Sequence, residues 1–269
     1  MSSKETIGFI GLGSQGGPMA ERIVDAGYAL KLWARRPEAL APFLAKGASA
    51  AETVAELGAA CDHIGVCVVD DAGVAQVCEQ LIPAMKRGSR LVIHSTILPD
   101  SCVALAQACV DRGIGFLDAP VSGGGPAAAA GKLTVMCGGI AETFAQAKPV
   151  FDTFAGLTVH LGDAGAGQRA KIVNNALMAA NMGLAHAAMQ AAVALGIDRS
   201  SFGELVKGSS GRSFGFETYV RLPDPTVFSH GAALLGKDVN LLNATLPGND
   251  GAELLRTTAK TFLDAACAE

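Results

Sequence analysis

The chain has 269 residues, enough for one large domain or two modest ones. Half of the residues are hydrophobic and 17% are charged, which excludes an intrinsically disordered chain. The formal net charge of −4 indicates no basic surface for nucleic acid or anionic lipid. We therefore expect a globular protein with no nucleic-acid or membrane partner.

The seven cysteines and five histidines show no pattern of a metal or disulfide framework. The cysteines form no C-x-x-C pair, and most lie in apolar segments, as is typical of reduced, buried thiols. The histidines lack metal-ligand spacing. A strand pattern follows residues 1–5 directly, without a signal-peptide pattern. We expect a cytoplasmic protein without a metal.

Short apolar runs alternate with helical patterns in the first part of the chain. Strands are expected at 6–10, 29–33, 63–69, 91–95, 115–118, 133–137 and 158–161. Helices are expected at 15–26, 37–46, 52–59, 72–86, 99–112 and 141–154. This alternation predicts an α/β fold with a doubly wound, mostly parallel sheet, which binds ligands at the carboxyl ends of its strands.

The pattern changes near Gly162, after which no convincing strand remains. One very long helix is expected at about 167–195, with Gly196 just after its end. Further helices are expected at 198–208, 213–221, 226–245 and 250–267. The sequence thus predicts a nucleotide-binding domain over 1–163 and an all-α C-terminal domain over 164–269, which begins with the long interdomain helix.

The segment 172–197 contains no Asp, Glu, Lys or Arg and is long enough to span a bilayer. It is rich in alanine, however, and it carries the polar residues Asn174, Asn175, Asn181, His186 and Gln190. A long helix buried against other helices explains this composition better than membrane insertion. Such a helix is suited to burial against a partner subunit, so we expect a homodimer or homotetramer.

A glycine-rich turn follows the first strand and opens the first helix, with the sequence Gly11-Leu12-Gly13-Ser14-Gln15-Gly16. The pattern G-x-G-x-x-G gains its meaning from this strand–turn–helix context. The glycines permit a tight turn and a close approach of the backbone to a pyrophosphate, which lies at the positive end of the helix. We therefore expect a Rossmann-type domain that binds a nicotinamide dinucleotide through these six residues.

The end of the second strand favours one form of the cofactor. NAD-specific sites usually place an acidic residue there, whereas this strand continues into Ala34, Arg35 and Arg36. A guanidinium group can pair with the 2′-phosphate of NADP and stack on its adenine. The alternative interpretation is that Arg35 and Arg36 are solvated side chains at a helix start and do not contact the cofactor. The pattern favours NADP(H) over NAD(H).

Three further segments carry groups suited to substrate chemistry. The run Asp118-Ala119-Pro120-Val121-Ser122-Gly123-Gly124 ends a strand and offers a hydroxyl and backbone N–H groups to an anionic substrate. The long helix opens with Gly167, Lys171 and Asn175 at a spacing of four, which puts a gap, an ammonium and an amide on one face. Lys237 and Asp238 lie in a later helix.

Lys171 borders the uncharged part of the long helix, where an ordinary surface lysine would be poorly solvated. Burial lowers a lysine pKa toward the range that is useful for proton transfer. The alternative from the residues alone is a solvated charge, with Asn175 making an ordinary hydrogen bond.

Four ordered motifs resemble the β-hydroxyacid dehydrogenases, the family that contains 3-hydroxyisobutyrate dehydrogenase and several semialdehyde reductases. They are GFIGLGSQGGPMA, DAPVSGG, GAGQRAKIVNN and GKDVNLL, and the resemblance runs from Ile7 to about Leu263. It implies hydride transfer between NADP(H) and a small 3-hydroxy acid or aldehyde acid.

The same resemblance implies roles for individual residues. Lys171 would be the general acid/base and Asn175 would orient the substrate, whose carboxylate would be held by Ser122, Gly123 and Gly124. Lys237 would lie near both substrate and nicotinamide. The cofactor would also run along Val68, Val69, Asp70 and Thr96.

Two features depart from the family pattern. Members generally continue into a Gly-rich, Asp-containing segment that borders the active site, whereas this sequence ends at Ala266-Cys267-Ala268-Glu269. We expect a more open cleft or an unusual substrate. The loop 208–216 is also distinctive: Arg212 could bind a distal anion, and its two phenylalanines could line an apolar pocket. The alternative is a flexible connection with a surface arginine.

Two other functions stay open at this point. An imine reductase shares the expected architecture, but such enzymes generally have Asp or Tyr where this chain has Lys171. A non-catalytic NADP(H)-binding sensor or scaffold is supported only by the departure at the C-terminus. The sequence does not separate glyoxylate, succinic semialdehyde, methylmalonate semialdehyde or a larger aromatic acid as substrate.

Overall fold

A computed structural model describes residues 5–268, and the chain folds as two compact units that divide in the sequence between Lys171 and Ile172. The long helix α8 (Ala166–Ala194) belongs to both units. The division proposed from the sequence, after residue 163, stays a prediction.

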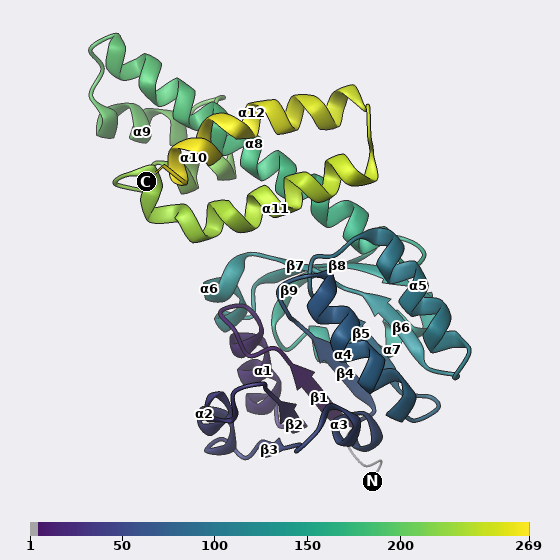
Figure 1. Cartoon of the computed structure of the whole chain (residues 1–269). Helices are drawn as coiled ribbons and strands as arrows, with labels where there is room; N and C mark the ends of the chain where they lie inside the picture. The colour runs from purple at the N-terminus through teal and green to yellow at the C-terminus, as the bar shows by residue number, and fades with distance from the viewer. Residues whose placement is uncertain (1–4, 269) are drawn as a thin grey trace. The chain divides into compact units, whose positions relative to one another are not determined.

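The first unit is built on a largely parallel sheet, whose strand order is β3-β2-β1-β4-β5-β6-β8-β7, with β9 also paired to β8 (Figure 1). The first six strands in this order, β3, β2, β1, β4, β5 and β6, run parallel to one another. Strand β8 is antiparallel to its neighbours β6 and β7. Their bounds are β1 (Thr6–Ile10), β2 (Ala29–Trp33), β3 (Ser49–Ala50), β4 (His63–Val66), β5 (Arg90–Ile93), β6 (Gly115–Asp118), β7 (Val121–Ser122), β8 (Leu133–Gly139) and β9 (Ala155–His160).

Helices cover both faces of this sheet and bury a separate apolar cluster on each face. One cluster includes Met19 of α1 and Phe151 of α7, and the other includes Leu57 of α3, Leu81 of α4 and Cys102 of α5. The helices are α1 (Gly16–Asp25), η1 (Pro37–Leu40), α2 (Ala41–Leu44), α3 (Val54–Ala60), α4 (Asp71–Ala84), α5 (Pro99–Val110), α6 (Gly124–Ala129) and α7 (Ala141–Phe151). The predicted doubly wound α/β domain is confirmed.

Three details of this unit differ from the prediction. The strand expected at 63–69 ends at Val66, and the Val68 N–H donates to the Ser95 hydroxyl and not to a neighbouring strand. Helix α6 was not predicted, because it opens with two glycines and a proline. The short strands β3 and β7 were also not predicted, because two residues carry no measurable periodicity.

The second unit contains only helices among its residues up to 268. After α8 come α9 (Arg199–Lys207), α10 (Phe214–Tyr219), η2 (Pro225–Phe228), α11 (Ser229–Thr245) and α12 (Asp250–Ala266). Gly196 follows α8 with φ +80°, and the N–H of Ile197 donates to Ala192 O at 2.9 Å, the closing bond of a helix C-terminus. The all-α character and the glycine stop are both confirmed.

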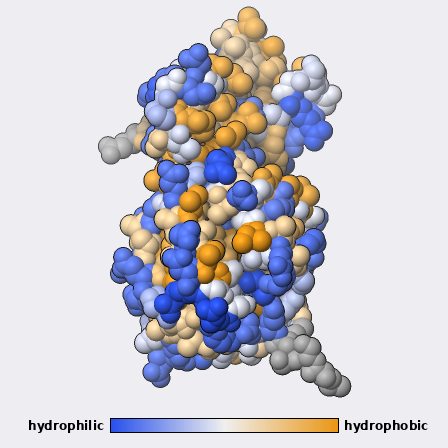
Figure 2. Space-filling view, turned by 90° about the vertical axis from the view of Figure 1, so that its right-hand side faces the viewer, coloured by the Kyte–Doolittle hydropathy of each residue, from blue (hydrophilic) through white to orange (hydrophobic). Residues whose placement is uncertain are grey.

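The long helix α8 has a segment without charge after Lys171, but within residues 5–268 no helix is long and apolar enough to cross a membrane. Figure 2 shows apolar side chains at the surface of the helical unit. On α8, the side chains of Leu184 and Val193 are 58% and 54% exposed. An apolar helix face of this kind is suited to a partner subunit, and the homo-oligomer stays a prediction.

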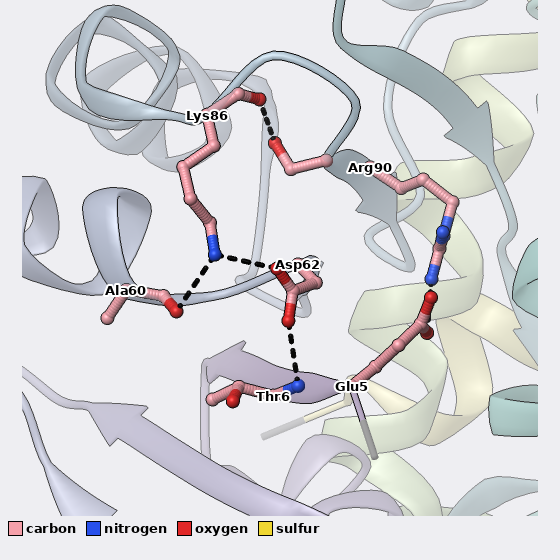
Figure 3. Close-up of polar contacts among 7 residues, drawn as sticks. Glu5, Thr6, Ala60, Asp62, Lys86 and Arg90 are labelled. Carbon is pink, nitrogen blue, oxygen red and sulfur yellow. Dashed lines mark hydrogen bonds and ion pairs between the residues drawn. The ribbon is translucent and has the colours of Figure 1, made fainter. Parts of the chain in front are cut away.

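A polar network lies at the amino ends of the central strands, at the opposite end of the sheet from the glycine-rich turn (Figure 3). Asp62 accepts from the Thr6 N–H at 3.0 Å and from Lys86 Nζ at 2.6 Å. Burial opposes the charged form, but these donors outweigh it and lower the pKa of Asp62. Arg90 is buried and pairs with Glu5.

Two histidines of the central strands are buried among aromatic rings. His94 stacks on Phe9, and its ring meets the edges of Phe151 and Phe154. Its Nδ1 lies 2.8 Å from Ala119 O. Burial lowers the pKa of His94 from 6.5 to about 4, and burial also lowers the pKa of His63 well below 6.5.

We expect the free energy of unfolding to fall as the pH drops from about 6.5 toward 4. The unfolded chain binds a proton at each histidine near pH 6.5, whereas the folded protein does not until the pH is lower, so acid favours unfolding. For His94 the interval between 6.5 and about 4 corresponds to about 3 kcal/mol. Urea unfolding of His94→Phe across this range should show a smaller loss than the parent. The control His230→Gln, at an exposed histidine, should lose stability with falling pH as the parent does. If the free energy of unfolding falls equally with pH in all three proteins, His94 is not the cause of the loss.

Candidate active site

The glycine-rich turn between β1 and α1 has no room for side chains at two of its glycines. Gly11 has φ +98°, and a Cβ atom there would lie 2.0 Å from Cys67 O. A Cβ atom on Gly16 would lie 2.0 Å from Gly11 O. The turn is therefore tight against the residue that follows β4, as the sequence predicted.

A pocket of about 280 Å³ lies at the carboxyl ends of β1, β2 and β4. It is lined by Ile10, Gly11, Leu12, Gly13, Trp33, Ala34, Arg35, Arg36, Ala39, Cys67, Val68 and Val69. Eight of these residues were predicted to bind the cofactor. Ile10, Trp33, Ala39 and Cys67 were missed, although the end of a parallel strand is itself the signal for a ligand site.

The groups around the turn fit a dinucleotide phosphate. No side chain caps the N-terminus of α1, so the positive end of this helix is available to an anion. A Cβ atom on Gly13 would meet nothing within 4 Å, so the backbone there can be approached closely. The buried Nε2 atom of Gln15 has no hydrogen-bond acceptor. A phosphate oxygen would satisfy such a donor.

Arg35 and Arg36 follow β2 and line this pocket with exposed side chains. Among the described lining residues there is no aspartate or glutamate. The lining therefore carries two guanidinium groups and no carboxylate that would repel a 2′-phosphate.

The other predicted cofactor residues do not line the pocket. Ser14, Gln15 and Gly16 belong to the turn and the start of α1, and Thr96 follows β5. Asp70 is the N-cap of α4, and its Oδ1 accepts from the Gly73 N–H at 2.9 Å. Its carboxylate thus stabilises a helix start, which the sequence analysis did not predict.

The loop proposed to hold a carboxylate lies beside the glycine-rich turn. Ser122 ends β7, and Gly123 and Gly124 both have positive φ, at +128° and +73°. A Cβ atom on the next residue, Gly125, would lie 2.6 Å from Ser14 O. The fold therefore brings two loops together that are more than 100 residues apart in the sequence.

Two residues of the substrate motifs attach α8 to the sheet. Asp118 is fully buried, and its carboxylate accepts from the Gly165 N–H at 2.7 Å and the Gln168 N–H at 2.8 Å. Gly167 was expected to leave a gap toward a substrate. A Cβ atom there would lie 2.3 Å from Met136 O, so the gap instead lets α8 pack against the sheet.

Lys171 lies in the second turn of α8 and is buried, with 8% of its surface exposed. This burial agrees with the expectation that Lys171 is not an ordinary solvated lysine.

The predicted substrate residues Asn175 and Lys237 belong to the helical unit, and both contact Asp238. Asn175 donates from Nδ2 to Asp238 Oδ2 at 2.5 Å. Lys237 Nζ lies 3.4 Å from Asp238 Oδ1, an ion-pair distance without hydrogen-bond geometry. Sequence reasoning noted Asp238, which is buried, but did not assign it to the site. Its position next to Lys237 was the only available signal.

The binding role proposed for the loop 208–216 stays a prediction. Arg212 is exposed, and its Nε donates to Glu217 Oε1 at 2.5 Å. Phe214 is 71% exposed, but Phe216 is buried in the core of the helical unit. The expectation that both phenylalanines line a pocket is therefore wrong for Phe216, which packs against the helices around it.

Known proteins resemble both units. The family described as the NAD binding domain of 6-phosphogluconate dehydrogenase matches residues 6–162, and the family described as NAD-binding of NADP-dependent 3-hydroxyisobutyrate dehydrogenase matches residues 165–269. Mitochondrial 3-hydroxyisobutyrate dehydrogenase from Bos taurus is 32% identical over 100% of this chain and 84% of its own length. NAD-dependent L-serine dehydrogenase from Pseudomonas aeruginosa is 36% identical over 87% of this chain and 83% of its own length.

Among solved structures, that of Mycobacterium tuberculosis 3-hydroxyisobutyrate dehydrogenase with L-serine has a TM-score of 0.85. It is 29% identical to this chain and covers 98% of it and 95% of the solved chain.

Proposed function

The chain belongs to the β-hydroxyacid dehydrogenase family, and we propose that it transfers a hydride between NADP(H) and a small 3-hydroxy acid or aldehyde acid. The observation that carries the cofactor preference is the pocket at the glycine-rich turn, which is lined by Arg35 and Arg36 and by no carboxylate among the described residues. The relatives named for L-serine and 3-hydroxyisobutyrate support a substrate of this size.

The glycine-rich turn and the N-terminus of α1 would hold the pyrophosphate, while Arg35 and Arg36 would pair with the 2′-phosphate. Val68, Val69 and Thr96 would lie along the cofactor. The bound nicotinamide supplies or accepts the hydride.

The protein's own contribution is to orient the substrate and to move one proton. Ser122, Gly123 and Gly124 would donate hydrogen bonds to the substrate carboxylate, and Asn175 and Lys237 would help to orient it. In the direction of reduction, the Lys171 ammonium would donate a proton to the oxygen of the former carbonyl group. In the direction of oxidation, neutral Lys171 would accept the hydroxyl proton.

The testing experiment is a screen of small carbonyl acids and hydroxy acids with both cofactors. We expect turnover of at least one aldehyde acid or 3-hydroxy acid, with kcat/KM at least about 10-fold higher for the NADP form, because each charge-assisted contact to the 2′-phosphate contributes about 1.5 kcal/mol or more. A cyclic imine serves as the comparison substrate. Turnover of the imine alone, or a preference for NADH, would overturn this proposal.

A further inference from the structure

The start of α8 is tied to the sheet by a buried glutamine. Gln168 is fully buried, and its side chain contacts the segment that follows β5. Its Nε2 donates to Ser95 O at 2.8 Å, and its Oε1 accepts from the Ile97 N–H at 3.2 Å. The amide therefore satisfies two backbone groups on either side of Thr96, which sequence similarity assigns to the cofactor site.

The N-terminus of α8 is capped by a residue from the sheet. Gly165 precedes the helix and has no side chain with which to cap it. The Asp118 carboxylate, at the end of β6, accepts instead from the N–H groups of Gly165 and Gln168. A carboxylate at this position satisfies two orphan donors and complements the helix dipole. The close packing of Gly167 on the backbone of β8 completes the attachment.

The same hydrogen bonds continue to the wall of the cofactor pocket. Ser95 is buried, and its Oγ accepts from the Val68 N–H at 2.8 Å. Val68 lines the pocket. An uninterrupted chain of contacts therefore runs from Val68 through Ser95 to Gln168, in the helical turn that precedes Lys171.

We propose that Gln168 and Asp118 are positioning residues that hold the Lys171 turn of α8 in register with the cofactor-binding ends of β4 and β5. The inference rests on the proposed role of Lys171 as the acid/base. Lys171 follows Gln168 by three residues, so a rotation or shift of this turn moves both side chains together. A displacement of about 1 Å can reduce catalysis by as much as 100-fold, so a rigid attachment at this point has a direct effect on the reaction.

Gln168→Met is the primary test, because it preserves the length of the side chain and removes both of its hydrogen bonds. We expect kcat to fall about 10-fold or more, in line with a misplaced proton donor. The pH profile of kcat should shift by about half a pH unit or more, because the donor no longer has the same surroundings. Asp118→Asn, which replaces an acceptor by a donor opposite two N–H groups, should have the same effect.

Cofactor binding gives a readout that is separate from turnover. Trp33 is the only tryptophan and lines the cofactor pocket, so quenching of its fluorescence by NADPH reports the dissociation constant. We expect this constant to change less than about 3-fold in Gln168→Met, because the arginines and the glycine-rich turn are untouched.

Asp62→Asn is the matched control. Asp62 also accepts a backbone N–H through its carboxylate, but it lies at the amino ends of the strands (Figure 3). The Asp62→Asn variant should have a lower melting temperature than the parent but the same kcat and the same pH profile of kcat.

A fall in kcat with a shifted pH profile and retained NADPH binding supports the positioning role. Unchanged kcat in Gln168→Met, or a fall in kcat with an unshifted profile like that of a merely destabilised protein, overturns it. Full activity of Lys171→Ala would instead sink the proposed function, whatever Gln168→Met shows.

Discussion

Replacing Lys171 by alanine is expected to lower kcat for aldehyde-acid reduction by about 10²–10⁴-fold, the usual contribution of a general acid or base. Lys171 is buried in the second turn of α8, in a segment that otherwise lacks charge up to Ile197. The substitution removes the ammonium group that we propose as the proton donor to the developing alkoxide. The measurement is the rate of NADPH consumption at saturating substrate.

Binding of NADPH to the same variant should be retained, because Lys171 is not among the residues that line the cofactor pocket. Quenching of Trp33 fluorescence measures this directly. Lys148→Ala is a matched control, since Lys148 is exposed and pairs with Asp152 on α7, and it should keep full activity. A Lys171→Ala enzyme as active as the parent would remove the proposed acid/base.

Replacing Arg35 and Arg36 together by alanine is expected to raise the KM for NADPH by about 10- to 100-fold and to leave the KM for NADH nearly unchanged. Each charge-assisted contact to a phosphate contributes about 1.5–3 kcal/mol, and about 1.4 kcal/mol corresponds to a tenfold change in affinity. Both side chains are exposed, and solvent weakens such contacts, so the expected rise in KM lies below the sum of two full contacts. Steady-state kinetics with both cofactors provides the measurement.

The salt dependence of the same kinetics sharpens the test. Pairing between arginine and a phosphate is screened by salt, so the KM for NADPH of the parent enzyme should rise with ionic strength more steeply than that of the double variant. Arg256→Ala, which removes an arginine paired with Glu253 on α12, is the control and should change neither cofactor's KM. An equal rise in KM for NADPH and NADH would assign the arginines to the adenine ring or to general charge instead of the 2′-phosphate.

Elements with strong local signals were predictable from the sequence. Three such features depend only on residues that are close together in the sequence: the glycine-rich turn, the arginines after β2 and the end of α8 at Gly196. The strands of the sheet were recognised because they are short, apolar and bounded by helical patterns. Besides the two-residue strands β3 and β7, the exception was the segment after Val66, where the apolar residues Cys67, Val68 and Val69 line a pocket and do not continue the strand.

Residues whose partners are distant in the sequence were not predictable. Asp118 accepts from the N–H of Gly165, 47 residues later, and Gln168 bonds to a segment about 70 residues earlier. No periodicity or motif spacing encodes such a hydrogen bond, because it exists only once β5, β6 and α8 have come together. Asp70 is a different case, because it accepts from the N–H of Gly73, only three residues later, and its proposed place along the cofactor stays a prediction.

The sequence by itself determined that β1 and α1 form a dinucleotide-binding turn, since only glycine tolerates the conformation and the close contacts there. It also determined the long helical continuation, because an alanine-rich segment without charge forms a helix wherever it can be buried. The tertiary structure alone decided how the turn of Lys171 is held. The burial of Asp118 and Gln168 makes their hydrogen bonds to backbone groups costly to lose, and these bonds join the first turn of α8 to the end of β6 and to the segment that follows β5.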